Sequence, residues 1–160
     1  MKNNNTDSQF RTVRGYQLAK QEKNQLTPAM EDYLEMTYRI CLKENYARVG
    51  KLSELLHVRP SSTSKMVFKL ADQGFLKYER HEIILLTEKG REIGAYLLNR
   101  HDIVEQFLTL ISSEIPIEET ELIEHSLSPE TIAHLNTLIE FFKNDANVKK
   151  RFDEFRKNRE

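Results

Sequence analysis

The sequence has a single cysteine, Cys41, among its 160 residues. One cysteine cannot form an intrachain disulfide, and it excludes zinc sites that are built on several thiolates. We expect Cys41 to be a small core residue rather than a nucleophile. No apolar run approaches the ~18 residues that a membrane-spanning helix needs, and the N-terminus lacks the apolar stretch of a signal peptide. The sequence therefore predicts a cytosolic protein, with one domain or two small ones that share a core.

Positive charge is missing from one stretch of the chain. Residues 114–142 include seven acidic residues and neither lysine nor arginine, whereas residues 48–80 carry seven basic residues against three acidic ones. The formal net charge of −1 hides this segregation. One region could face nucleic-acid phosphates while the other collects cations. Two ordinary solvated faces would have the same composition.

Capping residues and apolar spacing predict a mainly α-helical fold with one small β-hairpin. Residues 1–25 are polar and without clear periodicity, which indicates a flexible arm. Helices are expected to begin at Thr27-Pro28, Thr87, Ser128-Pro129 and Asp145. Shorter helices are expected over residues 51–56, 61–73 and 118–127, and strands over residues 75–78 and 83–86. Gly74 is expected to end the second short helix in a left-handed conformation.

Two short helices joined by a tight turn and followed by a hairpin predict a winged helix-turn-helix. At 100° per residue, the core-facing side of the second helix consists of Thr63, Met66, Val67 and Leu70. The opposite side offers short hydroxyls and lysines near a helix N-terminus, which favours phosphate. The predicted DNA contacts are Arg59, Ser61, Ser62, Ser64, Lys65, Phe68, Lys69 and Arg80. A plain surface helix capped by serines would show the same helical pattern, but the hairpin and the positive charge favour DNA binding.

Phe68 is the unusual member of the predicted DNA-binding face, because an exposed phenylalanine there has no role in the core. It could contact a thymine methyl group. Alternatively, it could pack against the neighbouring helix.

Three groups of candidate metal ligands stand out. They are Asp32 with Glu35, His101 alone, and Glu121 with Glu124 and His125. Spacings of three and four residues place the members of a group on one helical face. Each group also has an ordinary explanation, because paired acids are usually solvated and a lone histidine in an apolar stripe is usually a hydrogen-bonded core residue. Taken together, carboxylates with imidazole and no thiolate suit Mn(II), Fe(II), Co(II) or Zn(II), whereas all-oxygen sites suit magnesium or calcium.

Several short segments occur at the spacing of a known family. They are residues 26–35 (LTPAMEDYLE), 46–49 (YARV), 60–62 (PSS), 65–67 (KMV), 85–87 (LLT), 89–90 (KG), 100–101 (RH), 105–108 (EQFL) and 123–125 (IEH). On these segments the chain resembles the manganese-responsive repressors (MntR type) of the diphtheria-toxin-repressor family. The resemblance covers about residues 26–142 at unbroken spacing.

The resemblance implies a two-metal site formed by Asp32, Glu35, His101, Glu121, Glu124 and His125. Asp32, His101 and Glu124 would mainly hold the first metal. Glu35 and His125 would mainly hold the second, with Glu121 and Glu124 shared. Iron-sensing relatives carry cysteine where this chain has Glu124, and a carboxylate there favours manganese. The implied cofactor is Mn(II), two ions per subunit, with Fe(II), Co(II), Zn(II) and Cd(II) as substitutes.

The resemblance also implies a function. We expect a homodimeric, manganese-activated repressor of metal-uptake genes that binds near-palindromic double-stranded DNA, and neither an enzyme nor a binder of membranes or small organic substrates. The expected division is an arm (1–25), a winged helix-turn-helix domain (26–96) and a helical metal-binding and dimerisation domain (97–160). Two alternatives remain open: a binuclear carboxylate enzyme, and a winged-helix regulator that responds to no metal. The apolar stripe of the helix after Pro129 is expected to pack on a partner subunit; the stripe consists of Ile132, Leu135, Ile139 and Phe142.

Overall fold

The computed structural model describes residues 26–79, 83–111 and 114–159. The predicted N-terminal arm and Arg80 lie outside the described residues. The helices are α2 (Pro28–Glu44), α3 (Val49–Leu55), α4 (Pro60–Asp72), α5 (Glu88–Leu110), α6 (Pro116–Ile123), α7 (Pro129–Asn144) and α8 (Ala146–Lys157). The strands are β1 (Ala47–Arg48), β2 (Leu76–Tyr78) and β3 (Ile83–Leu86), and the 3-10 helix η2 (Glu124–Ser126) follows α6. The predicted fold class, mainly α-helical with a small sheet, is confirmed.

Local capping interactions determine where four of the helices begin. Thr27, Thr87 and Ser128 each accept a hydrogen bond from the backbone N–H three residues further on, at the starts of α2, α5 and α7. The Asp145 carboxylate caps α8 in a similar way. All four starts are predicted from the sequence, because a cap depends only on neighbouring residues. Gly74 follows α4 with φ of +79°, which confirms the predicted left-handed residue.

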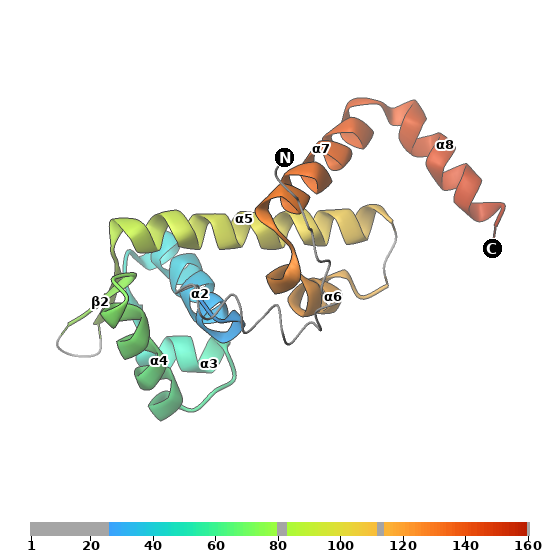
Figure 1. Cartoon of the computed structure of the whole chain (residues 1–160). Helices are drawn as coiled ribbons and strands as arrows, with labels where there is room; N and C mark the ends of the chain where they lie inside the picture. The colour runs from blue at the N-terminus through green and yellow to red at the C-terminus, as the bar shows by residue number, and fades with distance from the viewer. Residues whose placement is uncertain (1–25, 80–82, 112–113, 160) are drawn as a thin grey trace, which may run out of the picture.

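Helices α2, α3 and α4 surround one apolar core, and the small sheet lies beside them (Figure 1). The sheet is antiparallel with strand order β1-β3-β2, and Leu76 lies opposite Leu86 in the hairpin. The predicted hairpin is therefore confirmed. The sequence analysis missed β1, where Ala47 pairs with Ile84. A strand of two residues has no periodicity of its own, so only its long-range pairing reveals it.

Helix α5 joins the two ends of the molecule (Figure 1). It packs against α2 near its beginning and against α6 and α7 further along. Gly94 lies where α2 and α5 meet, and a Cβ atom at this position would be 2.7 Å from the Tyr38 Cβ. A residue without a side chain therefore lets the two helices approach closely, and this approach positions α2 relative to the second half of α5.

The second half of the chain differs from the sequence prediction in two respects. The helix expected over residues 118–127 is instead α6, which begins at Pro116 and ends at Ile123, followed by the 3-10 turn η2. The apolar stripe of α7 was expected to pack on a partner subunit, and this expectation is wrong for two of its residues. Ile132 and Ile139 are buried in one cluster with Val104 of α5 in the same chain. Large apolar side chains that do remain exposed on α7 are Leu138 and Phe141.

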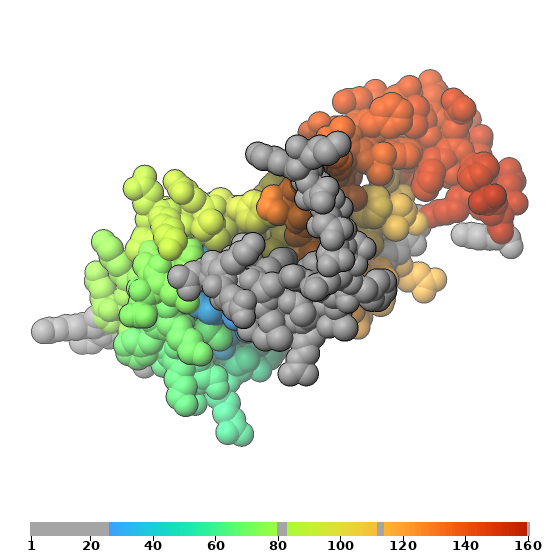
Figure 2. All heavy atoms as spheres, viewed as in Figure 1, coloured from blue at the N-terminus to red at the C-terminus, as the bar shows by residue number. Residues whose placement is uncertain are grey.

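Helices α7 and α8 project from one end of the molecule, and the elements around α4 lie at the other (Figure 2). Helix α8 has no fully buried residue and packs mainly on α7, where Phe152 makes an edge-to-face contact with Phe142. None of the described helices combines the length and the apolar composition needed to cross a membrane.

Candidate metal centre and DNA-binding face

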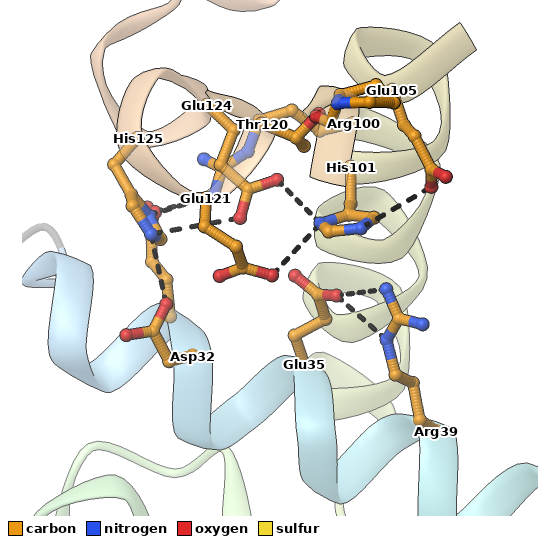
Figure 3. A network of polar contacts seen from close by, with 12 residues as sticks. Asp32, Glu35, Arg39, Arg100, His101, Glu105, Thr120, Glu121, Glu124 and His125 are labelled. Atoms are coloured by element: carbon orange, nitrogen blue, oxygen red, sulfur yellow. Dashed lines mark hydrogen bonds and ion pairs between the residues drawn. The ribbon is translucent and has the colours of Figure 1, made fainter. Parts of the chain in front are cut away.

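Helix α2 supplies two carboxylates on one face. Asp32 is partly exposed, whereas Glu35 is buried despite its charge. The Arg39 guanidinium donates two hydrogen bonds to Glu35 Oε1, from Nε at 2.9 Å and from Nη2 at 2.7 Å. The other oxygen of Glu35 lies toward His101 and Glu121 (Figure 3). Arg39 therefore balances the buried charge of Glu35 and leaves one oxygen directed at the other candidate ligands.

Helix α5 contributes His101, which is 6% exposed. Its Nδ1 lies 3.1 Å from Glu124 Oε2 and 3.6 Å from Glu121 Oε1. Its Nε2 faces away from these carboxylates, 3.8 Å from Glu105 Oε2. His101 therefore lies within the apolar stripe of α5, as the sequence indicates. It differs from an ordinary core histidine because its ring faces the carboxylates of two candidate ligands.

Helix α6 contributes Glu121, and the turn between α6 and α7 contributes Glu124 and His125. The α-helix tightens into η2 immediately before the Ser128-Pro129 start of α7, and this turn places Glu124 and His125 side by side. Glu124 is the most enclosed carboxylate of the site, at 1% exposure. Its Oε2 faces His101, and its Oε1 lies 3.8 Å from His125 Nε2. Its two oxygens thus face two different imidazoles (Figure 3).

The described residues form two overlapping groups that could hold a metal ion. One group is Asp32, Glu124 and His125, and the other is Glu35, His101 and Glu124. In each group, one candidate ligand atom per residue lies within 4.8 Å of the others. Glu124 belongs to both groups. Each group also includes residues from two regions that are more than 60 residues apart in the sequence.

This grouping differs from the pairing that the family resemblance implies. The resemblance places Asp32 with His101 and Glu35 with His125, whereas the structure places Asp32 with His125 and Glu35 with His101. The reason is geometric, since His125 Nε2 is 3.0 Å from Asp32 Oδ1. Glu121 belongs to neither group and is more than half exposed, although it lies near His101.

Four charged residues of the network are absent from the predicted site: Glu31, Arg39, Arg100 and Glu105. Glu31 Oε2 lies 2.7 Å from His125 Nδ1 and accepts a hydrogen bond of 2.9 Å from Arg100. Arg100 is 3% exposed, so its charge requires a partner. Its position next to His101 is a signal that sequence reasoning could have used. Glu31 gives no such signal, because an acid in the first turn of a helix is common.

The electrostatics of the site favour protonated histidines when no metal is bound. Burial lowers the pKa of His125, but hydrogen bonds to Asp32 and Glu31 outweigh this effect and raise the pKa to about 9. The hydrogen bond to Glu124 raises the pKa of His101. Burial, reinforced by the Glu124 charge, raises the pKa of Glu121. Protonated imidazoles and the two arginines therefore offset repulsion among the carboxylates.

The donor atoms fit a divalent transition metal. Each group combines carboxylate oxygen with one imidazole nitrogen and contains no thiolate, a set that suits Mn(II) and its neighbours. Adjacent ligands of an octahedral ion at ~2.1 Å are about 3 Å apart. The 3.0 Å separation of Asp32 Oδ1 and His125 Nε2 agrees with this value. The carboxylates raise the pKa values of His101 and His125, so the space between them also favours a positively charged ion.

The predicted DNA-reading helix is α4. Its Thr63, Val67 and Leu70 are buried and Met66 is partly buried, which confirms the predicted core face. The other face is accessible; of the predicted DNA contacts, Arg59, Ser61, Ser62, Lys65, Phe68 and Lys69 are exposed and Ser64 is partly exposed. The predicted DNA-binding face of α4 is therefore accessible, and the individual DNA contacts stay predictions.

Phe68 packs against Tyr78 of the wing rather than against the neighbouring helix, and its contact with a thymine methyl group stays a prediction. It remains 59% exposed. Its ring makes an edge-to-face contact with Tyr78 of β2, with centroids 5.0 Å apart. Phe68 thus links the DNA-reading helix to the wing, and its outer surface remains accessible.

Two family models match successive parts of the chain. Residues 25–82 match the N-terminal DNA-binding domain of the iron-dependent repressors, and residues 87–153 match the metal-binding and dimerisation domain of the same family. The class is therefore a metal-dependent DNA-binding transcriptional repressor. The chain belongs to the iron-dependent repressor family, also called the diphtheria-toxin-repressor family.

Relatives with assigned roles agree with this placement. The chain is 40% identical to the HTH-type transcriptional regulator MntR of Bacillus velezensis, over 84% of this chain and 96% of that protein. It is 42% identical to MntR of Bacillus subtilis, over 78% and 89% of the two chains. These relatives are named as transcriptional regulators rather than as enzymes.

Solved structures share the fold. The metal-dependent transcriptional regulator MtsR aligns with a TM-score of 0.64 and 30% identity, over 72% of this chain and 55% of that one. The manganese regulator SloR aligns with a TM-score of 0.62 and 27% identity, also over 72% and 55%. The chain thus spans about half the length of these structures.

Proposed function

We propose that this protein is a manganese(II)-activated transcriptional repressor of metal-uptake genes, acting in the cytosol as a homodimer with two metal ions per subunit. The proposed ligands are Asp32, Glu35, His101, Glu121, Glu124 and His125. The MntR relatives, at 40% and 42% identity over most of the chain, support manganese as the activating metal. A carboxylate rather than a thiolate at Glu124 supports the same choice.

The observation that carries the proposal is the position of Glu124. It is buried, belongs to both candidate groups, and directs one oxygen toward each imidazole. Glu124 would therefore be able to serve both groups, with one oxygen for each. The groups that it joins also include Asp32 and Glu35, which lie on α2 within the DNA-binding unit.

The switch follows from where the ligands are attached. When bound, the metal supplies positive charge and coordination bonds between α2 and the α6–α7 turn. Asp32 and Glu35 would then hold α2 against His101, Glu124 and His125, and α2 shares its core with α4. In a dimer, metal held by these residues would fix the separation of the two α4 helices near one DNA turn, ~34 Å. Metal and DNA would favour the same geometry, so each should strengthen binding of the other, typically by ~1–3 kcal/mol.

A homodimer agrees with the matched dimerisation domain. A two-fold axis would present two α4 helices to successive major grooves, and the recognised sequence would be near-palindromic. Because the apolar stripe of α7 is used within the chain, the partner surface must be built from side chains that remain exposed.

Selection of double-stranded DNA from a random pool, with and without manganese, tests the proposed function. We expect enrichment of one near-palindromic sequence with manganese and weak, sequence-independent binding without it. The enriched DNA then serves for affinity measurements. Recovery of the same sequence at the same affinity without metal would support the metal-independent regulator instead. Metal-dependent hydrolysis of a substrate, without DNA selection, would support the enzyme.

Lys69→Ala should weaken DNA binding about equally for all sequences, because Lys69 is exposed on α4 and is expected to contact phosphate. The dependence of log affinity on log salt concentration should decrease by roughly one unit. Fluorescence anisotropy at several salt concentrations, on selected and on random DNA, measures both effects. Lys150→Ala is the control, because it removes the same charge from a side chain that is 76% exposed on α8, a helix remote from α4. This variant should change neither the DNA affinity nor its salt dependence. An altered sequence preference with an unchanged slope would show that Lys69 contacts bases.

Metal affinity should rise with pH. The pKa of His125 is about 9, so at neutral pH its Nε2 carries a proton that metal binding must displace. Between about pH 6.5 and 7.5 the apparent affinity for manganese should increase roughly tenfold for the proton released from His125, and further for any proton released from His101. Titrations in buffers of different ionisation enthalpy count the proton directly. His134→Gln, on the exposed side of α7, should leave the slope unchanged. An affinity independent of pH would contradict displacement of a proton from His125.

A further inference from the structure

Glu31 has a short contact with a proposed metal ligand but lies outside both metal-binding groups of the described residues. We propose, on the basis of the proposed function, that Glu31 is a positioning residue for the metal centre. It holds the Nδ1 side of His125 so that Nε2 is directed at the metal.

The contacts of the His125 ring differ on its two sides. Nδ1 lies 2.7 Å from Glu31 Oε2, and Nε2 lies 3.0 Å from Asp32 Oδ1 and 3.8 Å from Glu124 Oε1. Nε2 therefore faces the two carboxylates that share its group. A carboxylate behind a histidine ligand fixes the tautomer and the ring orientation, and it makes the coordinating nitrogen more basic.

Arg100 holds the Glu31 carboxylate in place. Its Nη2 donates a hydrogen bond of 2.9 Å to the same Oε2 that contacts His125. This nitrogen also lies 3.1 Å from His125 Nδ1. An arginine can only donate, so a proton on Nδ1 must point to Glu31 and not to Arg100. Arg100 lies on α5, Glu31 on α2 and His125 in η2, so the three residues join three elements.

The second histidine of the site provides an internal comparison. His101 Nε2 also has a carboxylate behind it, Glu105, but at 3.8 Å, which is too long for a hydrogen bond. The Glu105 side chain is 36% exposed, compared with 20% for Glu31. Each carboxylate carries the same charge near one imidazole, but only Glu31 hydrogen-bonds to its ring. Comparing Glu31→Gln with Glu105→Gln therefore separates positioning from a general effect of charge.

Glu31→Gln should weaken manganese affinity about 10- to 100-fold, whereas Glu105→Gln should weaken it less than about threefold. The measurement is metal titration by calorimetry on the full chain, with circular dichroism to verify the fold. Loss of the Glu31 charge leaves Arg100 buried without its partner. The double variant Glu31→Gln with Arg100→Met therefore repeats the test without that uncompensated charge, and the same loss of affinity is expected.

A spectroscopic measurement detects positioning directly. In wild-type protein loaded with ¹¹³Cd, the ¹⁵N resonances of His125 should show cadmium coupling at Nε2 and a proton on Nδ1. Glu31→Gln keeps an accepting oxygen and should retain this tautomer, whereas Glu31→Ala should give coupling at both nitrogens or at neither. Equal losses of affinity for Glu31→Gln and Glu105→Gln, or an unchanged tautomer in Glu31→Ala, would overturn the role of Glu31. A wild-type protein that binds no metal would overturn the proposed function as well.

Discussion

Glu124→Ala is expected to abolish the metal response of DNA binding and to reduce manganese affinity by at least about 100-fold. Glu124 is buried and is the one residue common to both candidate groups, so its removal deletes a ligand from each. Its hydrogen-bond partner is His101, which can become neutral when Glu124 is lost. The fold should therefore persist, together with weak, salt-sensitive DNA binding.

Calorimetric metal titration and anisotropy with the selected DNA measure these two effects of Glu124→Ala. Glu118→Ala is the matched control, because Glu118 is an exposed acid on the adjacent helix α6. Glu124→Cys should bind metal and shift the preference from manganese toward softer metals. If Glu124→Ala still showed the wild-type increase in DNA affinity with manganese, the bridging role of Glu124 would be wrong.

Gly94→Ala should destabilise the fold and weaken metal binding together. Alanine in a helix interior normally stabilises a protein by up to about 1 kcal/mol relative to glycine. Here the added Cβ would meet Tyr38 Cβ at 2.7 Å, and this contact involves the root of the side chain rather than its flexible end. Overpacking of this kind costs ~1–3 kcal/mol. Helix α2 would have to move away from α5, taking Asp32 and Glu35 away from His101.

Denaturant unfolding and metal titration of Gly94→Ala test this prediction, with Gly50→Ala as the control. A Cβ at Gly50 meets nothing within 4 Å in helix α3, so Gly50→Ala should raise stability by roughly 0.5–1 kcal/mol. Metal affinity should be unchanged in that variant. If Gly94→Ala were as stable as wild type and bound manganese equally well, the close approach of α2 and α5 would not position the site.

Local features of the fold are predictable from the sequence, and pairings between distant segments are not. Thr27, Thr87 and Ser128 identify helix starts because a cap involves only neighbouring residues. Strand β1 was missed because its two residues are defined by pairing with β3. The apolar stripe of α7 was correctly read as a buried face, but periodicity does not identify the partner. In the structure that partner is α5 rather than a second subunit.

The candidate site shows the same contrast between what the sequence predicts and what depends on contacts between distant segments. The family resemblance names the six proposed ligands, and the structure groups four of them, Asp32, Glu35, His101 and His125, around Glu124. Their pairing was predicted differently, because it depends on side-chain directions between helices. Glu31 and Arg100 were missed because their role comes from contact with His125, 94 and 25 residues away in the sequence.

The most direct test of the proposed switch compares wild type with Asp32→Ala. The affinity of each protein for the selected DNA is measured across a manganese titration. Asp32 lies on α2 and contacts His125, so it links the DNA-binding unit to the dimerisation domain without being expected to contact DNA. We expect wild type to bind DNA more tightly as manganese rises, and Asp32→Ala to require far more metal or to show no increase. An Asp32→Ala curve that superimposes on the wild-type curve would contradict metal coupling through α2.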